Sequence, residues 1–318
     1  MNVLSLFDGI SCGQLALERA GISYDNYYAS EIDKYAIQIT QKNFPNTIQL
    51  GDVKNWREWD LPKIDLILAG SPCQGFSRAG KQLNFDDPRS ALFFDFIDIL
   101  HSVKPKWFLL ENVKMKQEWV DIITQYLHGL QPIEINSALV SAQNRKRLYW
   151  TNIPDITQPK DKGILLKDIL FDDAIDISLS NVYGGWKEPH PRIHAKDKSP
   201  TIRTSAGGGH IPSLLLSDKA LKYMNRKTRD GRNHWDFFHY SDADHEKSRT
   251  VVANFYKGIP YNVLKQNGLI RKFHPVECER LQTLPDNYTK GVSNTQRYKA
   301  IGNGWTVDVI SHVLSFLF

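Results

Sequence analysis

The chain has 318 residues and a net charge of +5, and its 41% hydrophobic and 24% charged residues are typical of a folded protein rather than a disordered one. No apolar run reaches the ~18 residues that a membrane-spanning helix needs, and no basic stretch precedes the first apolar residues, which argues against a signal peptide. The three cysteines (Cys12, Cys73 and Cys278) lie far apart, so neither disulfides nor a metal site are predicted. We expect a soluble cytoplasmic protein of about two domains.

The first half of the chain alternates short apolar runs with helical patterns. Strands are expected at residues 3–7, 27–30, 64–69 and 107–110, and helices at 13–20, 33–43 and 90–102. This alternation predicts a mostly parallel sheet with helices on both faces. The apolar residues of 307–317 recur at helical spacing, which predicts a last helix beside the first strand.

Polar residues follow the ends of these strands. Because ligands bind outside the carboxyl ends of parallel strands, we expect a shared rim formed by Asp8, Glu31, Asp52, Cys73 and Glu111. The glycine-containing loop 7–13 opens a helix, and Glu31 follows Gly9 by 22 residues, where a carboxylate can accept both ribose hydroxyls of a nucleoside. Singly, these residues also suit a ligand-free turn or a solvated carboxylate. Together they indicate a nucleoside-containing cofactor.

Four further positions carry side chains suited to catalysis. Cys73 stands in a loop rich in proline and glycine, where backbone N–H groups can favour the nucleophilic thiolate. Glu111 ends a predicted strand, and a buried carboxyl can act as an acid near neutral pH. Arg145 and Arg147 offer fixed cations for phosphate or an anionic ring oxygen. The structural alternatives are strand capping for Glu111 and an exposed basic edge strand for the two arginines.

Residues 175–261 hold the whole net positive charge. This segment has 14 Lys or Arg against 9 Asp or Glu, and six of the ten histidines. Residues 226–240 interleave basic and aromatic side chains, which suits a nucleic acid whose bases can stack or be read at their edges. A solvated, loop-rich insertion is the alternative.

Six segments, in this order, resemble the motifs of the DNA (cytosine-5) methyltransferase family. They are its cofactor loop (Phe7-Asp8-Gly9), its cysteine motif (72–77), its ENV motif (111–113), its QxRxR motif (143–147), its RLQ motif (274–282) and its closing GN motif (302–307). Ser11 and Cys12 look closer to the eukaryotic de novo enzymes, and Gln143 with the RLQ segment looks closer to bacterial and phage enzymes. The subgroup therefore stays open.

The resemblance implies a Rossmann-like, S-adenosylmethionine-dependent methyltransferase sheet in residues 1–174 and 262–318. It also implies a smaller, irregular, β-rich target-recognition domain in residues 175–261, which is the basic segment.

The resemblance also implies S-adenosylmethionine as the cofactor. Glu31 would bind its ribose, Ile32 would contact the adenine and Asp52 the exocyclic amine. The implied cofactor-binding residues are Phe7, Asp8, Gly9, Ile10, Ser11, Cys12, Gly13, Glu31, Ile32, Asp52, Val53, Pro72, Asn303, Gly304 and Trp305. Cys12 would act through its backbone, and the thiols of Cys12 and Cys278 are expected to serve packing.

The implied catalytic residues are Cys73, Glu111, Arg147 and Arg145. Cys73 would add to cytosine C6, Glu111 would meet N3, Arg147 would meet O2, and Arg145 would meet backbone phosphate. The target base would be flipped out of the duplex. The implied DNA-binding residues are Gln74, Ser77, Arg203, Arg226, Arg229 and Arg232.

Double-stranded DNA is the implied partner, with a cognate restriction endonuclease as a candidate second one, for a monomer in a bacterial or phage-infected cell. One alternative is a tRNA cytosine-5 methyltransferase, which shares the fold and the cysteine but has little sequence at the recognition segment. Another is a non-catalytic DNA-binding homologue, a kind of protein that lacks the cysteine, the ENV glutamate or the cofactor acids. This chain contains them all.

Overall fold

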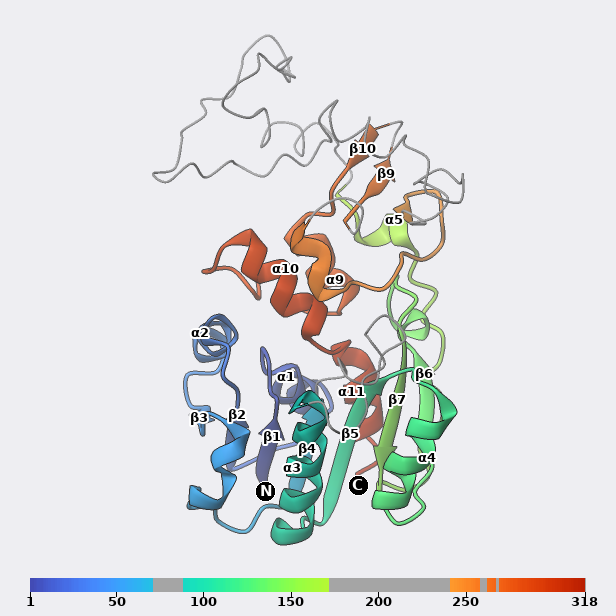
Figure 1. The fold of residues 1–318 in the computed structure, drawn as a ribbon. Coiled ribbons are helices and arrows are strands. Elements are labelled where there is room, and N and C mark those ends of the chain that lie inside the picture. Colours follow the sequence, from blue (N-terminus) through green and yellow to red (C-terminus); the bar gives the residue numbers. More distant parts are fainter. Residues whose placement is uncertain (71–87, 172–240, 258–261, 267–268, 318) are drawn as a thin grey trace.

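The structure is a computed structural model, and it describes residues 1–70, 88–171, 241–257, 262–266 and 269–317 (Figure 1). Several predicted site residues lie outside these ranges, namely Pro72, Cys73, Gln74, Ser77, Arg203, Arg226, Arg229 and Arg232. The described part of the chain includes no helix that is long and apolar enough to cross a membrane.

Within the described ranges, the main sheet has seven strands in the order β3-β2-β1-β4-β5-β7-β6. The strands are β1 (Asn2–Leu6), β2 (Asn26–Ser30), β3 (Ile48–Gln49), β4 (Leu66–Gly70), β5 (Trp107–Val113), β6 (Ile133–Asn136) and β7 (Lys146–Thr151). β1 to β5 run parallel, whereas β7 is antiparallel to both β5 and β6. The predicted, mostly parallel sheet is therefore confirmed.

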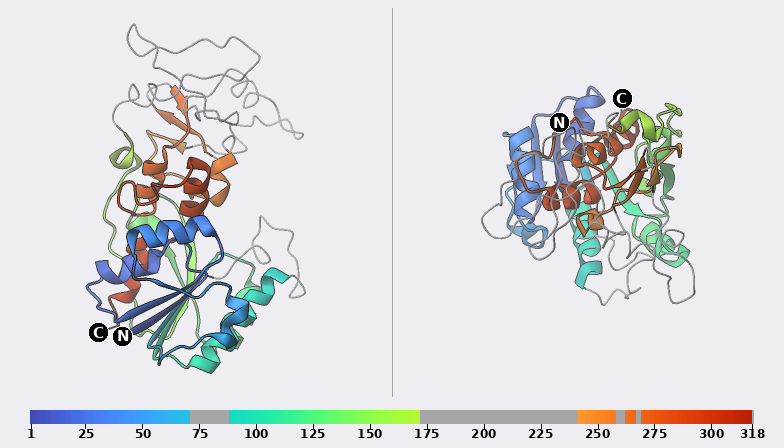
Figure 2. Two further views of the ribbon diagram at one scale, coloured as in Figure 1. Left: turned by 90° about the vertical axis from the view of Figure 1, so that its left-hand side faces the viewer. Right: turned by 90° about the horizontal axis from the view of Figure 1, so that it is seen from above.

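Helices cover both faces of this sheet, as Figure 2 shows in its left-hand view. They are α1 (Cys12–Arg19), α2 (Lys34–Asn43), α3 (Pro88–Val103), α4 (Gln117–Tyr126) and the last helix α11 (Val307–Leu314), with the 3-10 turns η1 (Val53–Glu58) and η2 (Ser137–Leu139). The predicted elements of the first half are all present, with ends that differ by a few residues.

Alternating side chains of the central strands enter two separate cores. Val3 packs in one cluster with α1 and α11, while its neighbour Leu4 packs in the other with α3 and α4. Leu109 and Leu110 of β5 divide in the same way. Because both faces are buried, the strands read as continuous apolar runs in the sequence. The last helix shares the core of Val3 in β1, as predicted.

Two sequence-based expectations about strand position are wrong. Glu111 does not end its strand: β5 continues to Val113, and Glu111 pairs with Gly70 on one side and Tyr149 on the other. β7, which contains the last two residues of the QxRxR segment, is not the edge strand of the structural alternative, because it lies between β5 and β6. Glu111 is therefore buried between two neighbouring strands and does not cap the end of its own strand.

The remaining described elements are grouped beyond the carboxyl end of the sheet (Figure 1). They are α5 (Leu166–Ile169), β8 (Ser241–Asp242), η3 (Ala253–Lys257), β9 (Leu264–Gln266), β10 (Leu269–Arg271), α9 (Pro275–Leu281) and α10 (Asn294–Asn303). β8 lies inside the predicted recognition segment and pairs with β9, which follows its predicted end. The domain boundaries stay a prediction.

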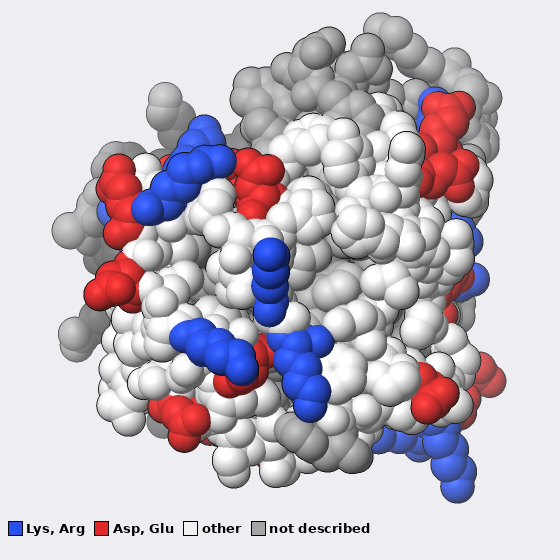
Figure 3. Space-filling view, turned by 90° about the horizontal axis from the view of Figure 1, so that it is seen from below, with Lys and Arg blue, Asp and Glu red and all other residues white. Residues whose placement is uncertain are grey.

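The face that Figure 3 shows from below carries scattered side chains of both charges over a largely uncharged surface. No broad basic patch is visible there. This view agrees with the charge count, since the sequence outside residues 175–261 is balanced.

Candidate active site

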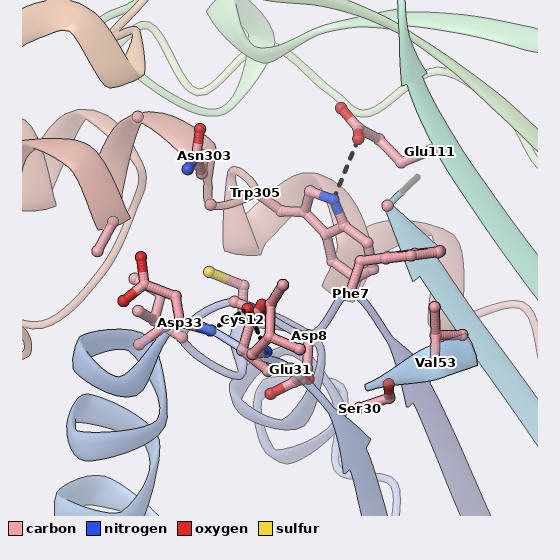
Figure 4. A pocket seen from close by; sticks show the side chains of 18 of the residues that line it. Phe7, Asp8, Cys12, Ser30, Glu31, Asp33, Val53, Glu111, Asn303 and Trp305 are labelled. Atoms are coloured by element: carbon pink, nitrogen blue, oxygen red, sulfur yellow. Dashed lines mark hydrogen bonds between the residues drawn. The ribbon is translucent and has the colours of Figure 1, made fainter. Parts of the chain in front are cut away.

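A cavity of about 420 Å³ lies at the carboxyl ends of β1, β2 and β4 (Figure 4). It sits where the strand order reverses around β1, which is the usual binding crevice of an open α/β sheet. Its opposite wall comes from α10 and the residues that follow it. Predicted site residues that line the cavity are Phe7, Asp8, Gly9, Ile10, Cys12, Glu31, Ile32, Asp52, Val53, Glu111, Arg145, Arg147, Asn303, Gly304 and Trp305.

The loop between β1 and α1 is held in an unusual backbone conformation. Phe7, Gly9 and Ser11 all have positive φ angles, of 58°, 63° and 56°. Such conformations cost energy in residues other than glycine and persist only where surrounding contacts impose them. Here the Ser11 hydroxyl donates to Asp8, which also accepts from the Tyr27 hydroxyl at 2.8 Å. The loop is therefore fixed in shape before any ligand arrives.

Asp8 is the partly buried centre of this loop. Burial raises the pKa of its carboxyl, and the hydrogen bonds from Ser11 and Tyr27 oppose that rise. Its backbone N–H donates to the carbonyl of Ser30 at 3.1 Å, which joins the loop to the end of β2. Ser11 does not line the cavity; it supports the loop from behind.

Glu31 ties the loops after β1 and β2 together. Its carboxylate accepts from the backbone N–H groups of Gly9, Ile32 and Asp33, each at 2.8 Å. Three charge-assisted bonds fix the orientation of the side chain and leave acceptor capacity on Oε2. Next to it, the large apolar side chain of Ile32 is 72% exposed.

Acidic side chains also cap the two helical segments beside the cavity. Asp52 accepts from Lys54 N–H at 3.0 Å at the start of η1. Asp33 accepts from Tyr35 N–H at 2.9 Å at the start of α2 and pairs with Lys299 of α10 at 2.7 Å. Lys299, with the backbone N–H of Tyr35, lowers the pKa of the partly buried Asp33 despite its desolvation.

The opposite wall contains Trp305, which packs against two glycines. A Cβ on Gly70 would lie 2.8 Å from its Nε1 atom, and a Cβ on Gly13 would lie 3.3 Å from its ring and 2.7 Å from Leu68. Both positions therefore require glycine, because a Cβ atom would overlap its neighbours. Gly13 does not line the cavity but makes room for the residue that does.

Glu111 connects this wall to the predicted catalytic residues. Its Oε2 atom accepts from the indole N–H of Trp305 at 3.1 Å (Figure 4). Its Oε1 atom lies 3.0 Å from Nε of Arg147 in an ion pair. Only 8% of Glu111 is exposed. A buried carboxylate, a guanidinium and an indole thus meet at one side of the cavity.

The expectation that Arg145 contacts DNA phosphate is wrong. The residue is 3% exposed, and its guanidinium donates to the backbone carbonyls of Val251, Gly302 and Gly304. Burial, with a smaller effect of the nearby Arg147, lowers its pKa to about 9, so the group stays charged at neutral pH. Its donors are used inside the protein and are not presented to solvent.

The two described cysteines are buried, as expected for packing residues. Burial raises the pKa of Cys12 to about 12 and that of Cys278 well above its ordinary value. Both thiols are therefore protonated at neutral pH and chemically quiet.

Sequence reasoning missed several residues that line the cavity. Asp33, Tyr35 and Ala36 begin the helix after β2, and Lys54 follows Asp52 in the next turn. Extending the strand-end argument by one helical turn would have found these four. Leu92 of α3, and Gln296 and Ala300 of α10, also line the cavity, and only the tertiary packing of their helices brings them there.

The strand order, with its antiparallel seventh strand and its cavity at the reversal point, defines a Rossmann-like methyltransferase fold. A solved structure of a DNMT2 mutant from Spodoptera frugiperda matches it with a TM-score of 0.65 at 20% identity, covering 100% of this chain and 99% of that one. A putative DNA modification methyltransferase encoded within an E. coli prophage matches with a TM-score of 0.66 at 22% identity, over 100% of this chain and 98% of that one. At these identities the likeness shows the fold alone.

The sequence comparisons go further than the fold. The model of the family described as C-5 cytosine-specific DNA methylase matches residues 1–318. The type II methyltransferase M1.ScrFI of Lactococcus lactis subsp. cremoris is 32% identical over 97% of this chain and 76% of its own length. The orphan methyltransferase M.SPRI of Bacillus phage SPR is 41% identical over 100% of this chain and 97% of its own. The chain belongs to the C-5 cytosine-specific DNA methylase family and is a DNA (cytosine-5) methyltransferase.

Proposed function

We propose that the protein transfers a methyl group from S-adenosylmethionine to C5 of a cytosine flipped out of duplex DNA, through a covalent adduct with Cys73. One observation carries the proposal. Glu111, the glutamate of the ENV motif, is buried and accepts from Trp305, so it borders the cavity that the cofactor motifs also line. Target base and cofactor would therefore meet at this carboxylate.

The cavity suits S-adenosylmethionine in volume and chemistry. About 420 Å³ is within the usual range for a small-molecule site. Ile32 offers an exposed apolar face to the adenine, Glu31 retains acceptor capacity for the ribose, and Asp52 lies nearby for the exocyclic amine. The first-turn N–H groups of α1 suit the methionine carboxylate. When bound, the cofactor supplies the electrophilic methyl group that cytosine C5 accepts.

The residues of the chain would activate the cytosine, because C5 is a poor nucleophile in the free base. The thiolate of Cys73 adds to C6 and forms a sulfur–carbon bond. Glu111 holds or donates a proton at N3, which removes charge from the ring as the adduct forms. Arg147, 3.0 Å from Glu111, stabilises the developing charge at O2. Loss of the C5 proton to a base then expels Cys73 and restores the aromatic ring.

Cys73 lies outside the described residues, and its role rests on the sequence. It stands in Pro72-Cys73-Gln74-Gly75, three residues after Gly70, which lines the cavity. Flipping the target base costs a few kcal/mol of stacking and pairing, and the basic segment of residues 175–261 is proposed to contact the DNA, through Arg203, Arg226, Arg229 and Arg232.

The relatives bear on partners and origin. They include proteins named type II and orphan methyltransferases, from bacteria and a phage. A bacterial or phage-infected cytoplasm is therefore proposed, while a cognate endonuclease and the monomeric state stay predictions.

Single-turnover transfer of labelled methyl from S-adenosylmethionine tests this function. Genomic DNA without modified bases and a tRNA pool are offered in parallel, and digestion with mass spectrometry locates the label. We expect 5-methylcytosine in DNA with the wild type and none with Cys73→Ser, which should still bind DNA. Label in tRNA alone would favour the tRNA alternative, and DNA binding without any transfer would favour the regulatory one; either result would overturn the proposal.

A further inference from the structure

Arg145 lies where two distant segments of the backbone cross beside the cavity. Its Nη1 donates to the carbonyl of Val251 at 2.7 Å, and its Nη2 donates to the carbonyl of Gly304 at 2.9 Å. Longer contacts of 3.5 and 3.4 Å reach the carbonyl of Gly302. Val251 lies near the end of the predicted recognition segment (residues 175–261), whereas Gly302 and Gly304 line the cavity.

The two backbones approach so closely that no side chain fits between them. A Cβ on Gly302 would lie 2.2 Å from the N atom of Ala253 and from the carbonyl carbon of Val252. Carbonyl groups that meet in a buried crossing need donors, because an unsatisfied one costs about 1–3 kcal/mol. The planar guanidinium supplies several donors at once, which a lysine ammonium cannot do in the same geometry.

Neighbouring glutamines complete the same connection. Gln143 accepts from Val251 N–H at 3.0 Å and donates to Gln282 at 2.9 Å. Gln282 in turn donates to the carbonyls of Ile301 at 2.9 Å and Gly304 at 3.2 Å. The carbonyl of Gly304 therefore has two side-chain donors, and Arg145 is the charged one.

We propose that Arg145 is a positioning residue of the cofactor pocket: it fixes the wall of residues 302–304 to Val251, near the end of the predicted recognition segment. It does so without touching DNA phosphate or the reacting atoms. The inference rests on the proposed function in one respect, that this pocket takes S-adenosylmethionine. Without Arg145, residues 302–304 would no longer be fixed to Val251. The affinity for the cofactor should then fall, while the affinity for DNA should not change.

The test compares Arg145→Gln with Arg271→Gln. Arg271 is also buried and bonded, to Glu277 and Gln266, but it does not line the cavity. For each full-length variant, calorimetry gives the Kd of S-adenosylhomocysteine, unfolding without ligand gives the Tm, and titration over a salt series gives DNA affinity. We expect Arg145→Gln to raise the cofactor Kd by about tenfold or more, the effect of one lost charge-assisted hydrogen bond.

If Arg145 had a purely structural role, Arg145→Gln would behave like the control variant Arg271→Gln. We expect the two variants to differ. Arg271→Gln should lower the Tm and leave the cofactor Kd unchanged, whereas Arg145→Gln should raise that Kd and the KM for S-adenosylmethionine with an unchanged salt slope for DNA. If Arg145→Gln fails to fold, Arg145→Lys decides, and its Kd should also rise because one ammonium cannot serve the separated carbonyls. An unchanged Kd in the folded variant, or a salt slope reduced by about one, would overturn the inference. Failure of the wild type to bind the ligand would instead overturn the proposed cofactor.

Discussion

The two walls of the cavity differ in how far apart in the sequence their contacting residues lie. On one wall, Glu31 and Asp8 hold the loops after β1 and β2 through partners that are at most 22 positions away. On the other wall, Gly302, Gly304 and Trp305 are held by Arg145 and Glu111, from 157 to 194 positions away. The first wall is built by strand ends and the second by packing between distant elements.

This difference has consequences for both stability and chemistry. The loops of the first wall are organised by the turns of a parallel sheet, and the Asp33–Lys299 ion pair joins this wall to α10. The second depends on buried polar groups satisfied across the molecule, and a single failure there leaves several carbonyls without donors. Changes to the second wall should therefore disturb folding, catalysis or cofactor binding, while changes to the first should chiefly disturb ligand binding.

The largest loss of stability should come from Gly302→Ala. Its Cβ would overlap the backbone of Val252 and Ala253, neither of which can rotate away, so we expect a loss of about 3 kcal/mol or more of unfolding free energy. Gly304→Ala is the matched control, since its Cβ would meet Cys12 at 3.2 Å and nothing closer. Denaturant unfolding measures both, and equal losses would contradict the close crossing.

On the first wall, Glu31→Gln should weaken the cofactor site. The amide keeps one acceptor oxygen but turns an NH₂ group toward backbone donors that now bond the carboxylate. We expect about 2 kcal/mol, or about thirtyfold, in the Kd of S-adenosylhomocysteine. Exposed Glu18→Gln provides the control. If both variants bind equally well, Glu31 does not organise the loops.

Trp305→Phe would separate the roles of the second wall. A smaller aromatic ring would take the place of the indole, and the donor to Glu111 would be lost. We expect the single-turnover methylation rate to fall by about tenfold, or about 1.4 kcal/mol, with a small change in cofactor Kd. Rapid-quench kinetics measures the rate, and an unaltered rate would show that Glu111 needs no positioning by the indole.

The smallest effect concerns pH and the helix that leads to Gln282. Neutral His274 accepts from Val276 N–H at 3.2 Å and caps α9, and burial lowers the pKa of its imidazole. A depressed folded pKa gives stability that is present above about pH 6.5, the unfolded value, and is lost as the pH falls through the folded value.

His274→Asn keeps a capping oxygen without titrating in this range. The fall in unfolding free energy between pH 7 and pH 5 should therefore be smaller in the variant than in the wild type. Urea unfolding at each pH measures it. Identical pH dependences would mean that another group is responsible.

The sequence predicted most of the loops of the first wall, and it predicted residues of the second wall without the contacts that hold them. Strand ends, glycines and the acidic spacing from Gly9 to Glu31 are local signals, so they predicted the loops that line the cavity. Arg145 looked like a surface cation because it stands in a basic run, and only the crossing of Val251 with Gly302 explains its burial. The extension of β5 past Glu111 likewise depends on its antiparallel partner β7.

The most direct test of the proposed chemistry is trapping of the covalent adduct. Duplex DNA with fluorine at C5 of its cytosines is incubated with the full chain and S-adenosylmethionine. Fluorine cannot leave as the C5 proton does, so the attacking thiolate cannot depart, and mass spectrometry of the digested complex identifies the attached residue. A stable adduct at Cys73, absent without the cofactor and absent in Cys73→Ser, is expected. An adduct at another residue, or none from protein that methylates ordinary DNA, would contradict the covalent role of Cys73.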